Sequence, residues 1–139
     1  MRRIVLDTNC LVSSLARTSK SYDVWKGLHD GRYILCVSND ILDEYQEIIE
    51  RKTTAQIAEN VIQYLINCSN VEFVIPYYHF NLIKADADDN KFVDCAIAAN
   101  ATFIVSNDRH YQPLQRINYP RVTVISLMQF VELLHDDNS

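Results

Sequence analysis

The chain has 139 residues, of which 48% are hydrophobic and 22% charged, and its net charge is −5. This composition is typical of one soluble globular domain, and the two glycines and three prolines exclude collagen-like and low-complexity chains. An acidic balance also argues against a passive nucleic-acid coat, which would show a basic stripe. No uncharged run approaches the roughly 20 apolar residues of a membrane-spanning helix. We therefore expect a single cytoplasmic domain over residues 1–139.

Short β-branched runs alternate along the chain with segments of helical period. In chain order, the pattern predicts a strand at 4–6, helices at 8–17 and 22–29, a strand at 33–37, helices with apolar stripes at 41–49 and 58–65, a strand at 71–74, a helix at 89–100, strands at 102–105 and 122–125, and a last helix at 127–134. Capping boxes are expected where Thr53 pairs with Gln56 and where Ser126 pairs with Gln129.

Apolar strands separated by helices predict βαβ units, and hence a parallel sheet covered by helices on both faces. We expect an α/β fold, a three-layer α/β/α sandwich with a five-stranded parallel sheet. Residues 76–88 form the one long stretch without a pattern, and loops of that length are often functional. The four cysteines lack the paired spacing of zinc or redox sites, so we interpret them as reduced core thiols.

Two acidic residues follow predicted strands. Asp7 comes directly after residues 4–6, and Asp108 lies in the turn after residues 102–105. Because ligands bind beyond the carboxyl ends of the strands in an open parallel sheet, both side chains are candidates for a site there. The alternative is that each caps the helix that follows, which is a common use of Asp after a strand.

Two further acidic residues lie on helices. Asp94 is the only charge in residues 92–99 and falls between Ile97 and Ala98 on the helical wheel, where a carboxylate is costly unless it meets a cation or several donors. Glu44 lies at the border of the apolar stripe of residues 41–49, where its side chain could either lean inward or extend to solvent. The other acids of that helix are expected to form a solvated face: Asp40, Asp43, Glu47 and Glu50.

Four carboxylates at one edge of a sheet would repel one another unless a divalent metal neutralised them. Oxygen-only ligands favour Mg²⁺ or Mn²⁺ over zinc. A site in which carboxylates hold such ions can hydrolyse a phosphodiester with metal-activated water.

The chain resembles the PIN-domain ribonucleases, including VapC-type toxins of bacterial toxin–antitoxin pairs. The resemblance rests on four segments in the order of that family: Val5-Leu6-Asp7-Thr8-Asn9, residues 38–44, residues 88–99 and residues 102–108. It implies a metal-dependent endoribonuclease with a quartet of catalytic and metal-binding acids: Asp7, Glu44, Asp94 and Asp108. It also implies supporting roles for Asn9, Ser106 and Asp89, although Asp89 could simply cap its helix. Mg²⁺ or Mn²⁺ would be the cofactor, RNA the substrate and an antitoxin a possible partner.

Other interpretations remain open at this stage. The same fold could serve RNA processing without a toxin role, or a binding module without catalysis. A receiver domain or an Asp-based phosphatase fits less well, because Asn9 stands where the phosphatase would need a second Asp. Arg109 and His110 could contact phosphate or belong to a solvated loop. The pair Tyr77-Tyr78 could stack on bases, or pack in the core or in a homodimer.

Overall fold

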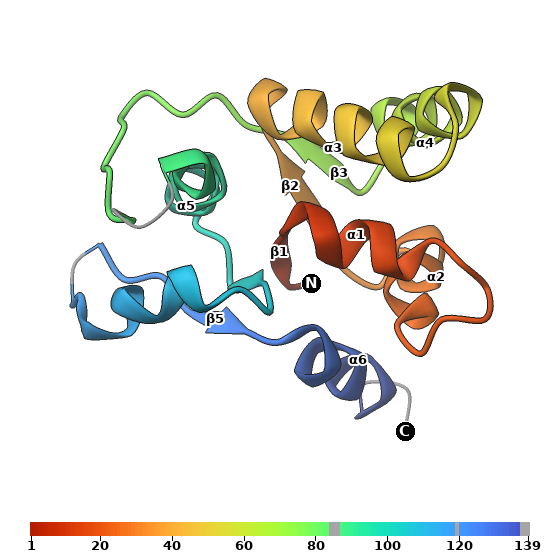
Figure 1. Cartoon of the computed structure of the whole chain (residues 1–139). Helices are drawn as coiled ribbons and strands as arrows, with labels where there is room; N and C mark the ends of the chain where they lie inside the picture. The colour runs from red at the N-terminus through yellow and green to blue at the C-terminus, as the bar shows by residue number, and fades with distance from the viewer. Residues whose placement is uncertain (84–86, 119, 137–139) are drawn as a thin grey trace.

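The computed structural model describes residues 1–83, 87–118 and 120–136. Regular elements follow one another in a β/α alternation (Figure 1). They are β1 (Arg3–Leu6), α1 (Thr8–Ser14), α2 (Tyr22–His29), β2 (Ile34–Val37), α3 (Asn39–Lys52), α4 (Ala55–Asn67), β3 (Val71–Phe73), the 3₁₀ helix η1 (Ala87–Asp89), α5 (Asn90–Ala99), β4 (Phe103–Val105), the 3₁₀ helix η2 (Arg109–Arg116), β5 (Val124–Ile125) and α6 (Leu127–Asp136).

The five strands form one parallel sheet in the order β3-β2-β1-β4-β5. Ile4, Val5 and Leu6 are all inaccessible to solvent, so the central strand β1 is covered on both faces. Figure 1 shows α5 on one side of the sheet and α1, α2 and α6 on the other. The α/β fold and the five-stranded parallel sheet predicted from the sequence are confirmed.

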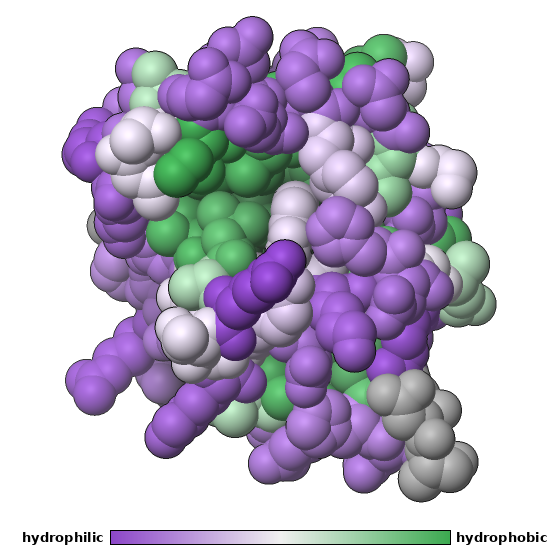
Figure 2. Space-filling model, turned by 90° about the vertical axis from the view of Figure 1, so that its right-hand side faces the viewer, coloured by the Kyte–Doolittle hydropathy of each residue, from purple (hydrophilic) through white to green (hydrophobic). Residues whose placement is uncertain are grey.

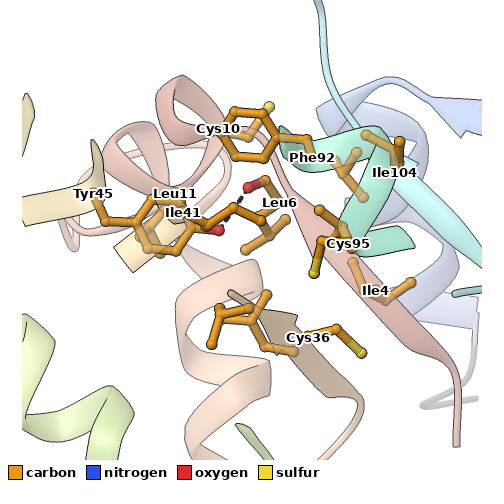
Figure 3. Close-up of a cluster of buried hydrophobic side chains, with 14 of the residues drawn as sticks. Ile4, Leu6, Cys10, Leu11, Cys36, Ile41, Tyr45, Phe92, Cys95 and Ile104 are labelled. Carbon is orange, nitrogen blue, oxygen red and sulfur yellow. Dashed lines mark hydrogen bonds between the residues drawn. The ribbon is translucent and has the colours of Figure 1, made fainter. Parts of the chain in front are cut away.

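The core packs the strands against the helices that position the acidic residues (Figure 3). Tyr45 on α3 is fully buried and donates a hydrogen bond of 2.6 Å from its hydroxyl to the carbonyl oxygen of Leu6. This bond ties α3 to the last residue of β1. Cys10 and Cys95 are buried, and burial raises the pKa of each thiol to about 12. The expectation of reduced core thiols holds for these two and for Cys36, whereas Cys68 is half-buried.

Several element boundaries differ from the sequence prediction. The N-cap of α4 is Thr54, whose hydroxyl accepts a hydrogen bond from the amide of Ile57, and not Thr53, because α3 continues to Lys52. Thr53 instead donates its hydroxyl to the carbonyl of Ile49. The 3₁₀ helix η2 was not expected, since Pro113 within it disrupts a helical pattern in the sequence.

The second capping box is confirmed, because Ser126 Oγ accepts from the amide of Gln129 and Gln129 Oε1 accepts from the amide of Ser126. Within the described residues, no helix has the length and apolar character that crossing a membrane requires.

Candidate active site

Asp7 and Asp108 meet at the carboxyl ends of two neighbouring strands. β1 and β4 pair directly, and the pairing continues one residue further through a bond of 3.0 Å from the Asp7 amide to the Val105 carbonyl. Ser106 connects the two acids, since its hydroxyl donates to Asp7 Oδ2 over 2.7 Å and accepts from the Asp108 amide over 3.0 Å. The adjacency of β1 and β4 therefore places both acids at one edge of the sheet.

Asp7 is buried, and its surroundings disfavour its charge. Burial raises the pKa of Asp7, the hydrogen bond from Ser106 lowers it, and the negative charges of Asp108 and Glu44 raise it further. The outcome is a pKa above the ordinary value for Asp. The Asp7 side chain makes no capping hydrogen bond to α1, although the residue occupies the N-cap position. The capping interpretation therefore does not account for this buried carboxylate.

Glu44 leans inward from α3, while the four other acids of that helix point to solvent. Its carboxylate accepts a hydrogen bond from the Thr8 hydroxyl and forms a salt bridge of 2.8 Å with Lys91 Nζ. Partial burial lowers the pKa of Lys91, but the hydrogen bond and charge of Glu44 outweigh it, so the pKa rises. In this structure a lysine ammonium thus supplies the positive charge beside Glu44.

Asp94 is buried on α5 and contacts residues of the segment 79–83. Its Oδ1 accepts from the Phe80 amide over 3.1 Å, and its Oδ2 lies 3.2 Å from His79 Nδ1. The segment is held in place by Asn90, whose side chain bonds both the amide and the carbonyl of Ile83. The buried carboxylate predicted from the helical wheel is therefore satisfied by donors from the long loop.

A third group of potential ligands surrounds His110. Its Nδ1 lies 3.2 Å from Asp89 Oδ2 and 3.2 Å from Asp108 Oδ1. The ligand atoms of these three residues all lie within 4.8 Å of one another. Asp108 also accepts from the His110 amide and so caps η2, as the alternative interpretation of this acid expected. Asp89 makes no capping bond to α5.

Tyr111 contributes an unusual polar atom to this region. Its hydroxyl is buried and has no hydrogen-bond partner within the described part of the chain. Burial raises its pKa, and the negative charges of Asp7, Asp89 and Asp108 raise it further, so the hydroxyl keeps its proton. An unpaired buried donor among carboxylates is the kind of group that a bound ligand or water would satisfy.

Cavities open onto the acids along this edge of the sheet. One of about 690 Å³ is lined by α3 and by residues within 76–81 and 88–94, and its lining includes Glu44 and Asp94. A smaller one of about 220 Å³ is lined by Asp7, Asn9 and Asp108, among others. Asn9 itself is exposed and accepts a hydrogen bond from Lys52 Nζ over 3.2 Å.

The structure thus brings three of the quartet, Asp7, Glu44 and Asp108, within electrostatic reach of one another. Asp94 shares the larger cavity with Glu44. The sequence did not reveal that Thr8 contacts Glu44 or that His79 contacts Asp94. Nor did it reveal the roles of Asn90, which bonds Ile83, and of Tyr111, whose buried hydroxyl feels the charges of the acids. Thr8 and Asn90 lie within the motif segments, so their positions were available, but nothing in the sequence assigned them a contact. The possible role of His110 was noted, without its proximity to Asp89.

Comparison with known proteins identifies the architecture. The PIN domain family matches residues 3–110. The chain belongs to this family. The fold is therefore that of PIN-domain nucleases, as the motif segments implied. A search of curated protein sequences found no significant match.

Solved structures of PIN domains resemble the chain over most of its length. A chain from the crystal structure of VapBC2 from Rickettsia felis, bound to a DNA fragment from its promoter, is 18% identical with a TM-score of 0.62, covering 89% of this chain and 98% of that one. One from DNA-bound VapBC of Salmonella typhimurium is 18% identical with a TM-score of 0.57, covering 91% and 99%. The T. brucei RRP44 PIN domain is 13% identical with a TM-score of 0.55, covering 99% and 83%.

Proposed function

We propose that the protein is a metal-dependent endoribonuclease. The observation that carries this proposal is the buried Asp7, whose pKa is raised by burial and by the charges of Asp108 and Glu44. Folding these carboxylates toward one another is unfavourable in the absence of a cation. A divalent ion would offset that repulsion, and an ion bound there would activate water for the hydrolysis of a phosphodiester.

The donor set fits a hard divalent ion. Asp7, Glu44, Asp94 and Asp108 would be the ligands, and they offer carboxylate oxygens, which suit Mg²⁺ and Mn²⁺. Asp89 extends the set, and His110 adds a nitrogen that the sequence analysis did not count as a ligand. When bound, such an ion would supply an activated water and offset the charge of the phosphate.

The surrounding residues would orient the acids. Ser106 fixes the Asp7 carboxylate through its hydroxyl and positions Asp108 through that residue's amide. Thr8 holds Glu44 from the first turn of α1. The buried hydroxyl of Tyr111 remains protonated and has a hydrogen bond to donate to a water or to substrate.

The test is cleavage of a fluorescent RNA with Mg²⁺, with Mn²⁺ and with chelator. We expect metal-dependent cleavage by the wild type and its loss in Asp94→Asn, which removes a ligand charge at nearly constant volume. Glu50→Gln is the matched control, because Glu50 is exposed on α3 and should leave cleavage unchanged. Cleavage at the wild-type rate by folded Asp94→Asn would refute the assignment.

We further propose that the nuclease is the toxin of a toxin–antitoxin pair. Two of the similar structures are VapBC complexes bound to DNA, which supports this role. Co-expression with the product of the adjacent small reading frame, followed by pull-down, should recover a complex, and overexpression alone should arrest growth. If neither occurs, an RNA-processing role is favoured, in line with the similarity to the RRP44 PIN domain. Light scattering would distinguish a monomer from a homodimer.

A further inference from the structure

The segment after Asp108 is positively charged in an otherwise acidic protein. Residues 109–131 contain three arginines and no Asp or Glu, whereas the whole chain has a net charge of −5. The segment forms η2 and β5 and leads into α6. It directly follows the acid that caps η2, since the His110 amide donates to Asp108 Oδ1 over 2.9 Å. Positive charge therefore lies directly beside the candidate active site.

Two arginines of this segment lie on η2, which buried side chains hold against the core. Tyr111 and Leu114 are each 1% exposed and anchor η2 in the core, while Arg109 and Arg116 are exposed. Within the described ranges, neither of these arginines makes a salt bridge. Because no described acidic residue pairs with them and the buried side chains of η2 hold their backbone in place, both guanidinium groups are available to an external anion.

Both arginines line one pocket on η2. Its volume is about 260 Å³, and its lining consists of Arg109, His110, Gln112, Pro113 and Arg116. These side chains offer cationic and amide donors, and none of the described lining residues carries a carboxylate. The larger cavity beside Glu44 differs, because the cations that border it are paired. Arg51 lies 2.9 Å from Glu47, and Lys91 lies 2.8 Å from Glu44.

We propose that the pocket between Arg109 and Arg116 binds a backbone phosphate of the RNA strand, next to the bond that is cut. This inference rests on the proposed ribonuclease function and names how that site holds its substrate. The carboxylates at this edge of the sheet repel a polyanion, so an RNA strand that reaches Asp108 needs compensating cations nearby. Guanidinium groups recognise phosphate through paired hydrogen bonds without reading the base. The pocket therefore sets the position and direction of the strand and leaves its sequence unread.

The geometry limits how much RNA the pocket holds. Arg109 and Arg116 are seven residues apart on a 3₁₀ helix, which corresponds to about 14 Å of helix length. Since a stacked strand advances about 3.4 Å per nucleotide, the two arginines span roughly four nucleotides or fewer. An acidic segment of a partner protein is the other anion that could occupy this pocket, and the experiment below distinguishes the two.

The test measures RNA binding and its salt dependence by fluorescence anisotropy. Two labelled single-stranded RNAs of different sequence are bound to proteins that all carry Asp94→Asn, so that the RNA stays intact. Arg109→Gln/Arg116→Gln is compared with Arg17→Gln/Lys20→Gln, which removes the same charge from the exposed loop between α1 and α2. Figure 1 shows that loop at the opposite end of the molecule from η2, and Figure 2 views the molecule from the loop's side. Circular dichroism checks that every variant is folded.

We expect the η2 double variant to raise the Kd of both RNAs about tenfold, since two charge-assisted contacts are lost. The slope of log K against log salt should become shallower by about 0.7, because neutralising one phosphate of a single strand contributes about 0.7. The loop control should change the Kd less than about twofold, and leave the salt slope unchanged. In proteins that retain Asp94, the η2 variant should raise KM and leave kcat nearly unchanged.

The proposal is overturned if both double variants weaken RNA binding equally, or if the η2 variant leaves the salt dependence of binding unchanged. It is also overturned if the η2 variant binds RNA normally but loses affinity for a polyglutamate peptide, which would assign the pocket to an acidic protein partner. Failure of the nuclease proposal gives a different result. In that case the wild type would bind RNA through η2 and cleave none of it.

Discussion

Replacing Ser106 with alanine should destabilise the protein chiefly at neutral pH. The Ser106 hydroxyl donates to the buried carboxylate of Asp7 over 2.7 Å and accepts from the Asp108 amide over 3.0 Å. A hydrogen bond to a charged group contributes about 1.5–3 kcal/mol and a neutral one about 1 kcal/mol. Because Asp7 can take up a proton once the bond is lost, we expect a net loss of about 2–3 kcal/mol at pH 7.

The size of the thermal shift follows from the chain length. An unfolding entropy of about 2.1 cal/mol/K per residue gives about 0.3 kcal/mol per kelvin for this chain, so Tm should fall by roughly 7–10 °C. The bond from Ser106 lowers the pKa of Asp7 and therefore stabilises its ionised form. Its contribution is present where native Asp7 is ionised and is lost as the pH falls through the pKa of that group. The loss caused by the substitution should accordingly shrink toward pH 4.

Thermal unfolding of metal-free protein at pH 7 and at pH 4 measures this effect. Ser14→Ala is the matched control, because Ser14 is also buried but donates its hydroxyl to a backbone carbonyl, that of Leu11, over 2.7 Å. The control should cost about 1 kcal/mol or less, with little dependence on pH. The reasoning is refuted if Ser106→Ala is no more destabilising than Ser14→Ala at pH 7, or if its effect is as large at pH 4.

Two further substitutions test the same description of the site. Asp7→Asn should raise Tm at pH 7 without metal, because the pKa of Asp7 is higher in the native than in the unfolded state, so stability is lost as the pH rises from the unfolded-state pKa through the native-state pKa. In thermal unfolding, Mg²⁺ should stabilise the wild type more than this variant. Asn90→Ala removes both hydrogen bonds to Ile83 and should lower the free energy of unfolding by about 2 kcal/mol, with amide hydrogen exchange accelerated more at Ile83 and Phe80 than in β1. Equal exchange in the variant and the wild type would contradict the role of Asn90 in holding this segment.

The sequence by itself determined the layered fold and the candidate acids. Ile4-Val5-Leu6 is apolar at every position, which a strand buried on both faces requires, and the same pattern recurs in β2 and β4. The carboxyl ends of parallel strands meet at one edge, so Asp7 and Asp108 could be brought together from the pattern alone. The helical wheel likewise indicated that Asp94 is buried and that Glu44 differs from its solvated neighbours.

Only the tertiary structure decided what those acids contact. Thr8 and Glu44 are 36 residues apart, and His110 and Asp89 are 21 apart, so neither pair arises from a local period. Hydrophobic periodicity reports which face of an element is buried, but it carries no information on which polar groups meet across two elements. That depends on the packing of α1, α3 and α5 around the sheet. The same packing buries the Tyr111 hydroxyl with no hydrogen-bond partner among the residues that the structure describes, and it leaves Arg109 and Arg116 exposed in the segment after Asp108.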